Sequence, residues 1–414
     1  MRPQYLRDRR PNSRPVALQK KLNRRRRRIL LSLSVLFIPL ILLVRLIRPL
    51  LLIRFGHVLK HKIGHCPLEA ELYLLEKKAK IQPEGAVDLF YFQHGTDGQA
   101  ANMFSMTLAK RSIVTSPLVE LLAIANAWVP GGDRHRIAIH LRDTHQLADV
   151  DKLMLRVPQQ IDLTDQEDAL GRDTLAQLGV PRDAKFVCFH VRSPSYWTRR
   201  RPGIGSDSDF RNSTIESYFE AMRLAAERGY YVLRVGDPLL PPLPEIHPRV
   251  IDYCTRARTE FMDVYLAARC SLMVSTASGI DAVSYMFRRP ILYVNVVTWG
   301  YMFINMPQPS QCMFKTFMKD GKPMKLEAVV AAGAQGFTTS DQFAAAGITL
   351  QENTSEEIAQ AVAEMLDGLE GKAVDPQTAE LQQRMRAIID TVPRYADWQF
   401  EVPGSYLRKH SELL

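Results

Sequence analysis

The sequence has little cysteine: five residues in 414, with no C-x-x-C pair and no cysteine–histidine cluster of zinc-like spacing. This excludes a disulfide-stabilised miniprotein and a structural zinc module. Only one long apolar run is present, which excludes a polytopic transporter. Hydrophobic residues make up 46% and charged residues 24% of the chain, so a full-sized core is expected and disorder throughout is excluded. Most of the cysteines have apolar neighbours, which predicts buried thiols in a reducing compartment: Cys66, Cys188, Cys254, Cys270 and Cys312.

Outside its N-terminus the chain also lacks an excess of positive charge. Residues 1–54 carry 15 Lys and Arg, including the run Arg24–Arg28, against the single acid Asp8. The other 360 residues hold 39 basic and 43 acidic side chains, so the net charge of +10 belongs to a tail. A basic surface spread over a nucleic-acid-binding domain is excluded, and we expect no nucleic acid as a partner.

The apolar run follows the basic tail directly. Ile29–Val44 is sixteen residues without a charge, and it reaches spanning length only if it continues past Arg45 and Arg48. No small-residue cleavage site follows, which argues against a signal peptide. We therefore predict a membrane-associated helix over 29–50, and we expect it to have no role in the α/β core.

Two topologies stay open for this helix. It spans the bilayer, with the basic arm in the cytoplasm and the body on the far side, or Pro39 kinks it and it lies in one leaflet. The cysteine composition and the activity argued below favour the second topology. We expect a protein of the inner (cytoplasmic) membrane whose body faces the cytoplasm.

From Leu51 onward, short apolar runs alternate with amphipathic helical stretches, the pattern of α/β layers. The first half predicts strands at 51–54 and 88–92 around a helix at 65–78, with weaker strand candidates at 113–114 and 137–140. The second half predicts five strands, at 186–191, 230–235, 250–253, 272–275 and 291–294. Helices are predicted between them at 214–228, 259–270 and 279–287, and later at 356–366 and 378–392. Such βαβ series argue for parallel sheets and two Rossmann-like domains.

The predicted organisation has six segments. They are a disordered basic arm (1–28), the membrane-associated helix (29–50), an N-terminal Rossmann-like acceptor domain (51–165), a linker (166–185), a C-terminal Rossmann-like nucleotide-sugar domain (186–330), and a helical region (331–414) that packs back on the domains.

Polar residues gather where the predicted strands of the second half end, which is where parallel sheets bind ligands. Arg192 follows one strand and Arg211 lies in the next loop, so two guanidinium groups are available for a diphosphate without a metal. Hydroxyls and backbone N–H groups of 275–279 suit a phosphate. The expected donor-binding residues are His190, Arg192, Tyr196, Arg211, Asn212, Asp237, Ser275, Thr276, Ser278 and Gly279.

Each of these signals has an ordinary structural explanation. Ser, Thr and Gly before a helix are most often an N-cap. An arginine after a strand is usually part of a surface ion pair, and Asp209-Phe-Arg-Asn-Ser213 could form an Asx-turn. Three such signals at strand ends of one predicted sheet favour an anionic ligand.

The order of these motifs resembles a family of bacterial glycosyltransferases. The motifs are His190-x-Arg192, Tyr196, Asp209-x-Arg-Asn-Ser213, Gly229-Tyr-Tyr-Val-Leu-Arg-x-Gly236, Tyr265-Leu-Ala and Ser275-Thr-Ala-Ser-Gly279. That family is distantly similar to O-fucosyltransferase-like enzymes of GT-B fold, which carry a His-x-Arg motif. The resemblance covers about residues 51–300 and implies a GT-B-like fold. Ser195 and Tyr196 stand where those enzymes have an acid, so a fucosyl donor is not implied.

For the catalytic base we expect His65, in a loop before the first helix, with Glu69 and Glu71 in reserve. A capping or core histidine is the alternative. Asp207-Ser-Asp209 is formally a metal-binding D-x-D, but such pairs are common and the arginines suit a metal-free site. No metal and no cofactor are expected. Asp237 is expected to hold a ribose hydroxyl.

The sequence thus predicts a membrane-attached, nucleotide-sugar-dependent glycosyltransferase acting on a cell-surface glycan or lipid-linked acceptor, with Arg192 and His65 as catalytic residues. The alternative is a non-catalytic, membrane-tethered sugar-binding or scaffold protein of a polysaccharide assembly complex. An NDP-sugar epimerase of the same fold is a third hypothesis.

Overall fold

The computed structural model describes residues 16–94, 100–139, 149, 151–193, 207–303, 305–372, 377–393, 395–396 and 400–414. The chain divides into two compact units. The first is Met1–Leu163 with Thr259–Val264, and the second is Thr164–Arg258 with Tyr265–Leu414. Both contain helices and parallel strands, so the predicted α/β class is confirmed.

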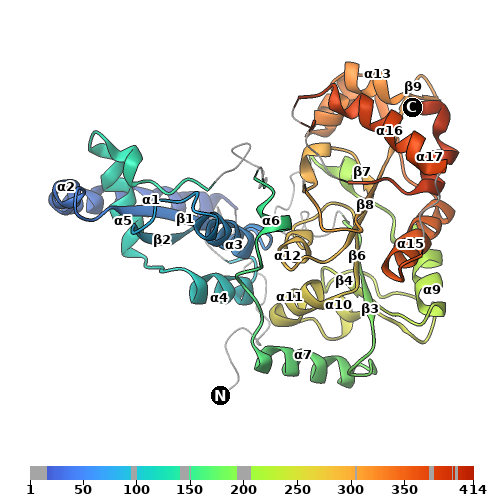
Figure 1. Ribbon diagram of the computed structural model, residues 1–414, viewed down its shortest axis with the longest axis horizontal. Coiled ribbons are helices and arrows are strands. Elements are labelled where there is room, and N and C mark those ends of the chain that lie inside the picture. Colours follow the sequence, from blue (N-terminus) through green and yellow to red (C-terminus); the bar gives the residue numbers. More distant parts are fainter. Residues whose placement is uncertain are drawn as a thin grey trace. The chain divides into compact units, whose positions relative to one another are not determined.

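The second unit is built on a parallel sheet of six strands (Figure 1). They are β3 (Phe186–His190), β4 (Tyr231–Val235), β5 (Val250–Ile251), β6 (Leu272–Ser275), β7 (Ile291–Val296) and β8 (Gln311–Phe314). Their order, β5-β4-β3-β6-β7-β8, is the 3-2-1-4-5-6 order of doubly wound nucleotide-binding sheets. The sequence predicted five of them and missed β8, which is only four residues long and follows a proline-containing loop.

Helices cover both faces of this sheet, which is why its strands are continuous apolar runs. On one face α9 (Phe219–Glu227) and α15 (Ser355–Leu369) pack together over Val187, Val232 and Val274 (Figure 1). On the other face α12 (Asp281–Met286) lies against β6 and β7, and Ser284 Oγ donates to the Ala267 carbonyl of α11 (Glu260–Arg269) at 2.9 Å. All five cysteines are buried free thiols, as predicted.

A smaller antiparallel sheet completes the second unit. Its order is β10 (Lys322–Pro323), β9 (Thr316–Lys319) and β11 (Ile348–Gln351), and it is accompanied by α13 (Leu326–Ala331), α14 (Ser340–Ala345), α16 (Gln377–Asp390) and α17 (Gly404–Lys409). The region 331–414 therefore contains a strand as well as the predicted helices. The predicted helix at 356–366 is α15, and it belongs to the main core.

The segment predicted as a linker, 166–185, lies within the second unit. Most of it is α7 (Asp165–Gln177), which starts with a capping box between Thr164 and Glu167. Arg269 makes a bidentate ion pair with Asp168, with both N–O distances 2.8 Å, and thereby ties α7 to the unit. A polar composition alone did not reveal this packing.

The first unit contains the parallel pair β1 (Ile53–Leu59) and β2 (Val87–Gln93), with α3 (His65–Lys78), α4 (Met103–Ser112) and α5 (Leu118–Trp128). Next to each of the two weaker strand candidates lies one parallel bridge: Phe90 with Thr115, which follows 113–114, and Phe55 with Arg136, which precedes 137–140. The described part of this unit is therefore a smaller parallel sheet than the Rossmann-like domain that the sequence predicts.

At the N-terminus, α1 (Val16–Ser34) is followed by a 3₁₀ turn (η2, Val35–Phe37) and α2 (Ile38–Ile47). Helix begins at Val16, inside the segment expected to be a disordered arm, because Arg, Lys, Leu and Gln are good helix formers. The turn just before Pro39 agrees with the predicted kink, since a proline cannot bond to the carbonyl four residues earlier. Among the described residues, one helical stretch, Arg25–Ile47, is long and apolar enough to cross a membrane.

The expectation that this helix has no role in the core is wrong. Ile41 and Val44 of α2 are buried in one cluster with Phe55 of β1 and with Val119 and Ala125 of α5. The period of α2 places these two side chains on one face, and α5 supplies the apolar surface that covers them.

We therefore expect Ile41→Ala to lower the free energy of unfolding of the first unit by about 2–5 kcal/mol, the usual cost of a buried cavity. Leu42, the next residue, is 53% exposed, so Leu42→Ala is the matched control and should cost far less. Hydrogen exchange of the β1 amides in the full chain, held in mild detergent, measures both. Equal effects of the two variants would contradict the packing role of α2.

Candidate functional site

The candidate site lies at the carboxyl ends of β3 and β6, the two central strands between which the strand order reverses (Figure 1). His190 is in register with Ser275 across this pair. Ligands of doubly wound sheets bind at this switch point. The sheet therefore brings together the residues after 190 and after 275, as the sequence predicted.

Arg192 follows β3 and is held by neutral groups. Its backbone N–H donates to Thr276 Oγ1 at 2.9 Å, its Nε donates to Asn212 Oδ1 at 3.1 Å, and its Nη2 donates to Ser208 Oγ at 2.7 Å. These bonds fix the direction of the guanidinium without neutralising its charge.

Arg211 is the second cation of the site. Its Nη2 donates to the Ala277 carbonyl at 2.5 Å, and its guanidinium lies 4.1 Å from the centre of the Tyr301 ring. Ala277 has a φ of +55°, a left-handed conformation that costs an alanine on the order of 1 kcal/mol. The strained turn directs this carbonyl to the arginine.

The two arginines have no carboxylate ion pair among the residues that the structure describes. Burial, and then the nearby Arg211 cation, lower the pKa of Arg192 to about 10, so it stays protonated at neutral pH. Burial also lowers the pKa of Arg211. Two partly desolvated cations that repel each other favour the binding of an anion between or beside them.

Asn212 connects the residues around the two arginines by hydrogen bonds. Besides accepting from Arg192, it donates from Nδ2 to Asp209 Oδ1 at 2.8 Å, and its carbonyl accepts from Lys315 Nζ at 2.7 Å. Lys315 follows β8, is buried, and also lies 3.4 Å from Glu352 Oε1. Asn212 is therefore a positioning residue, and Lys315 adds a third cation near the predicted pair.

The turn 275–279 serves the arginines and its own helix. Thr276 accepts from Arg192, and Ser278 N–H donates to Asp281 Oδ2, at the first residue of α12, at 2.5 Å. Ser275 is fully buried and Gly279 is exposed. The N–H of Ser278 is thus occupied by the carboxylate of Asp281, the first residue of α12.

His190 and Asp237 also lie at carboxyl ends of central strands. Burial, and then Arg192, lower the pKa of His190 to about 4, so its ring is neutral at pH 7. Asp237 follows β4, the second strand of the nucleotide-binding order, and its Oδ1 accepts from the Leu239 N–H at 3.1 Å. Tyr196, also predicted for the site, lies outside the described residues.

His65, the predicted base, lies in the first unit at the start of α3. Its Nδ1 is 3.0 Å from Glu69 Oε1, and Glu69 Oε2 accepts from the Leu59 N–H at 2.8 Å, at the end of β1. Because the carboxylate can only accept, Nδ1 carries the proton and Nε2 is left as an acceptor. The reserve candidate Glu71 is buried and accepts backbone N–H bonds from Gln160 and Ile161, so it is structural.

Three residues of the site were not predicted. Lys315 was missed because β8 was missed, and Tyr301 lies in an irregular loop after β7 that has no sequence signature. Asp281 could have been found from the Ser278-x-x-Asp281 spacing, which is typical of a helix cap. It is buried beside Ser275 and Arg211, and burial raises its pKa to about 7.

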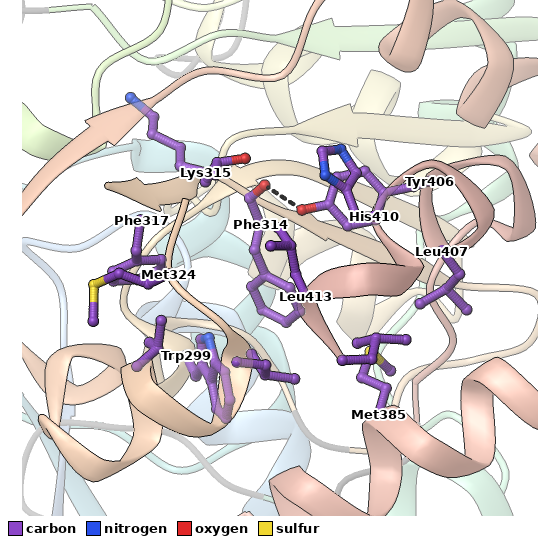
Figure 2. Close-up of a pocket in the computed structure, with 14 residues that line it drawn as sticks. Trp299, Phe314, Lys315, Phe317, Met324, Met385, Tyr406, Leu407, His410 and Leu413 are labelled. Carbon is purple, nitrogen blue, oxygen red and sulfur yellow. Dashed lines mark hydrogen bonds between the residues drawn. The ribbon is translucent and has the colours of Figure 1, made fainter. Parts of the chain in front are cut away.

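An apolar pocket lies elsewhere in the second unit (Figure 2). Its lining comes mainly from β8, β9, α16 and α17, and includes Phe314, Phe317, Met385 and Leu407. Lys315 contributes to the wall, but its ammonium group is bonded to Asn212. The pocket contains none of the predicted donor-binding residues.

In the described part of the chain, no group of three His, Cys, Asp or Glu side chains is placed to hold a metal ion. In the D-x-D pair, Asp209 binds the Asn212 amide, and the Asp207 carbonyl accepts from the Ser340 N–H at 2.7 Å. Asp209 thus fixes the loop with its carboxylate, whereas Asp207 does so with its backbone.

No protein-family model and no curated protein matches the sequence. Among solved structures, the chain is similar to a glycosyltransferase family 9 protein from Veillonella parvula, at 12% identity and a TM-score of 0.40, over 77% of this chain and 97% of that one. It is similar to E. coli ADP-heptose LPS heptosyltransferase II at the same identity and TM-score, over 77% and 98%. The iron-containing dodecameric glycosyltransferase TibC from enterotoxigenic E. coli has 12% identity and a TM-score of 0.35, over 78% and 82%.

The buried Asp281 predicts a pH dependence of stability. Its pKa is about 7 in the folded chain and near 3.8 when exposed, so the folded state retains a proton that the unfolded state has lost. The stabilisation that comes from this retained proton is complete below about pH 4, and it is lost as the pH rises through 7.

Asp281→Asn, which cannot ionise, should therefore raise Tm relative to the parent at pH 8, and this advantage should be clearly smaller at pH 5. The control is Asp320→Asn, an exposed carboxylate in the turn between β9 and β10, which should leave the pH profile of Tm unchanged. Thermal unfolding of the three proteins from pH 5 to 8 measures the effect, and parallel profiles would contradict a neutral Asp281.

Proposed function

We propose that the protein is a glycosyltransferase that takes a nucleotide-sugar donor on its second unit, without an obligatory metal. The observation that carries this proposal is the pair Arg192 and Arg211, two oriented guanidinium groups without a carboxylate ion pair among the described residues, at the switch point of a nucleotide-binding sheet. A nucleoside diphosphate is the anion that this sheet order and these cations suit best.

In the reaction, the bond between the sugar and the diphosphate breaks and negative charge develops on the leaving diphosphate. Arg192 and Arg211, supported by Lys315, stabilise that charge in place of a metal ion. Since their neutral partners fix their direction in advance, little reorganisation is needed in the transition state. Asp237 is assigned to a ribose hydroxyl, because it follows the second strand of the Rossmann order.

The acceptor hydroxyl must lose its proton, and we assign this step to His65. Glu69 orients the ring and stabilises the imidazolium that forms, in the way that a carboxylate supports a histidine base in other enzymes. The acceptor is proposed to be a cell-surface glycan or lipid-linked precursor. The apolar N-terminal helix and the buried free thiols support a location on the inner membrane with the body in the cytoplasm.

The donor site is tested with the full chain in mild detergent. One of the common nucleoside diphosphates should raise its Tm, and Arg192→Ala should lower kcat/KM for the matching donor by about 10²–10³-fold. Arg192→Lys should also lose activity, because an ammonium lacks the planar fork. Loss of the bonds to Asn212 and Ser208 should cost only about 1–2 kcal/mol of stability.

Arg228→Ala is the matched control, because Arg228 is a surface arginine paired with Asp367 at 2.6 Å. It should keep full donor binding and turnover. Near-normal turnover in a folded Arg192→Ala protein would contradict the donor site. Donor binding with no transfer and no hydrolysis, whatever the acceptor, would instead identify a sugar-binding protein.

His65→Ala tests the base separately. Donor binding should be unchanged, whereas turnover should fall by about 10²–10⁴-fold, the range for loss of a general base. Glu69→Gln should also lower turnover without changing donor binding, but by a smaller factor. The control is His247→Ala, since the His247 ring accepts a backbone N–H bond from Arg249 in a loop of the second unit. An equal loss of donor affinity and turnover would contradict the assignment.

A further inference from the structure

The N-terminal helices and α5 lie side by side within the first unit. Arg26 of α1 forms an ion pair with Glu120 in the first turn of α5, and Arg45 of α2 donates to Asn126 Oδ1 near the end of α5 at 2.6 Å. Arg26 thus contacts the start of α5 and Arg45 contacts its end. α5 therefore runs alongside α1 and α2 over most of the length of α5.

The inward face of this helical layer belongs to the core. Ser34, Ile41 and Val44 are buried, and the last two contact Phe55 of β1 and the apolar face of α5. The layer of α1, α2 and α5 is therefore held on the β1–β2 sheet by side-chain packing as well as by the covalent connections between these elements.

The outward face of the layer is exposed and apolar. Among the described residues, sixteen large hydrophobic side chains are exposed, and twelve of them belong to α1 through Leu51 and to α5. They are Ile29, Leu33, Val35, Leu36, Leu40, Leu42, Leu43, Leu46, Leu50, Leu51, Leu118 and Trp128. A patch of this extent exceeds what a water-facing surface carries and marks an interaction site.

The charges at the edges of this face identify the partner. Arg25, Arg27 and Arg28 are exposed at one end of the apolar stretch and Arg48 at the other. Arginines that flank leucines and an exposed tryptophan suit the headgroup region of an anionic bilayer.

A spanning arrangement conflicts with the packing. If Arg25–Ile47 crossed the bilayer, α5 and the edge of the β1–β2 sheet, which lie along it, would be carried to the depth of the hydrocarbon. Open sheet edges facing lipid leave backbone groups without hydrogen bonds and do not occur there. A helix that lies in the plane of the surface keeps the sheet on the aqueous side.

We propose that the outward face of α1, α2 and α5 is a docking surface for one leaflet of an anionic membrane, and that the chain does not cross the bilayer. Leu36, Leu40, Leu43 and Leu46 enter the leaflet, and Trp128 lies at its boundary. This proposal is independent of the reaction proposed above, since it rests on the first unit alone.

Vesicle binding of the full chain tests the surface. Leu36 and Leu46 are 74% and 77% exposed, so the double variant Leu36→Glu/Leu46→Glu should fold normally and bind anionic vesicles at least tenfold more weakly. Leu239→Glu, at a 57% exposed leucine of the second unit, is the control and should bind as the parent does. If the double variant still binds vesicles, or if it only dissociates a dimer, the face is not a lipid-docking surface.

The topology is tested in inside-out membrane vesicles of an expression host, with epitope tags at both ends of the chain. In-plane docking predicts that protease removes both tags from the same side, and that lipids brominated near the headgroup end of their acyl chains quench Trp128 fluorescence. Tags on opposite sides of the membrane would overturn the proposal in favour of a spanning helix.

Discussion

The pairing of β3 with β6 is the constraint on which the candidate donor site depends. The two strands are far apart in sequence, and the register that sets His190 beside Ser275 also brings Arg192 within a hydrogen bond of Thr276. From there the contacts spread outward, through Asn212 to Lys315 and through Ala277 to Arg211. Without this one parallel pairing, Arg192 would lose its bond to Thr276, and Arg211 would lose its bond to the Ala277 carbonyl.

Much of this sheet could be predicted because its strands are buried on both faces. The run Leu272–Ser275 has no helical period and is bounded by turns, and its limits were predicted to the residue. The strand order could not be predicted in the same way, because it depends on long-range pairing. Lys315 is an example. Because β8 was not predicted, nothing in the local sequence indicated that this lysine lies beside Asn212.

The turn 275–279 of the candidate site shows how contacts with a helix start and contacts with an arginine can come from neighbouring residues of one motif. The Ser278 N–H is bonded to Asp281 at the start of α12, and the strained Ala277, just before Ser278, turns its carbonyl toward Arg211. Composition suggested a phosphate cradle made of N–H groups. The geometry shows that the Ser278 N–H is bonded to Asp281 and that the Ala277 carbonyl is bonded to Arg211, so part of the turn positions a cation. Sequence alone could not show this, since it depends on the direction of a single carbonyl.

For the N-terminal helix, composition predicted the apolar character, but it could not predict which face of the helix packs in the core. Ile41 and Leu42 are equivalent by hydropathy, and only the presence of α5 makes one a core residue and the other a surface residue. One consequence concerns how the first unit keeps its fold. If the outward face docks on a bilayer as proposed, the bilayer acts thermodynamically as a ligand of the folded unit, so that membrane occupancy and folding become one linked equilibrium.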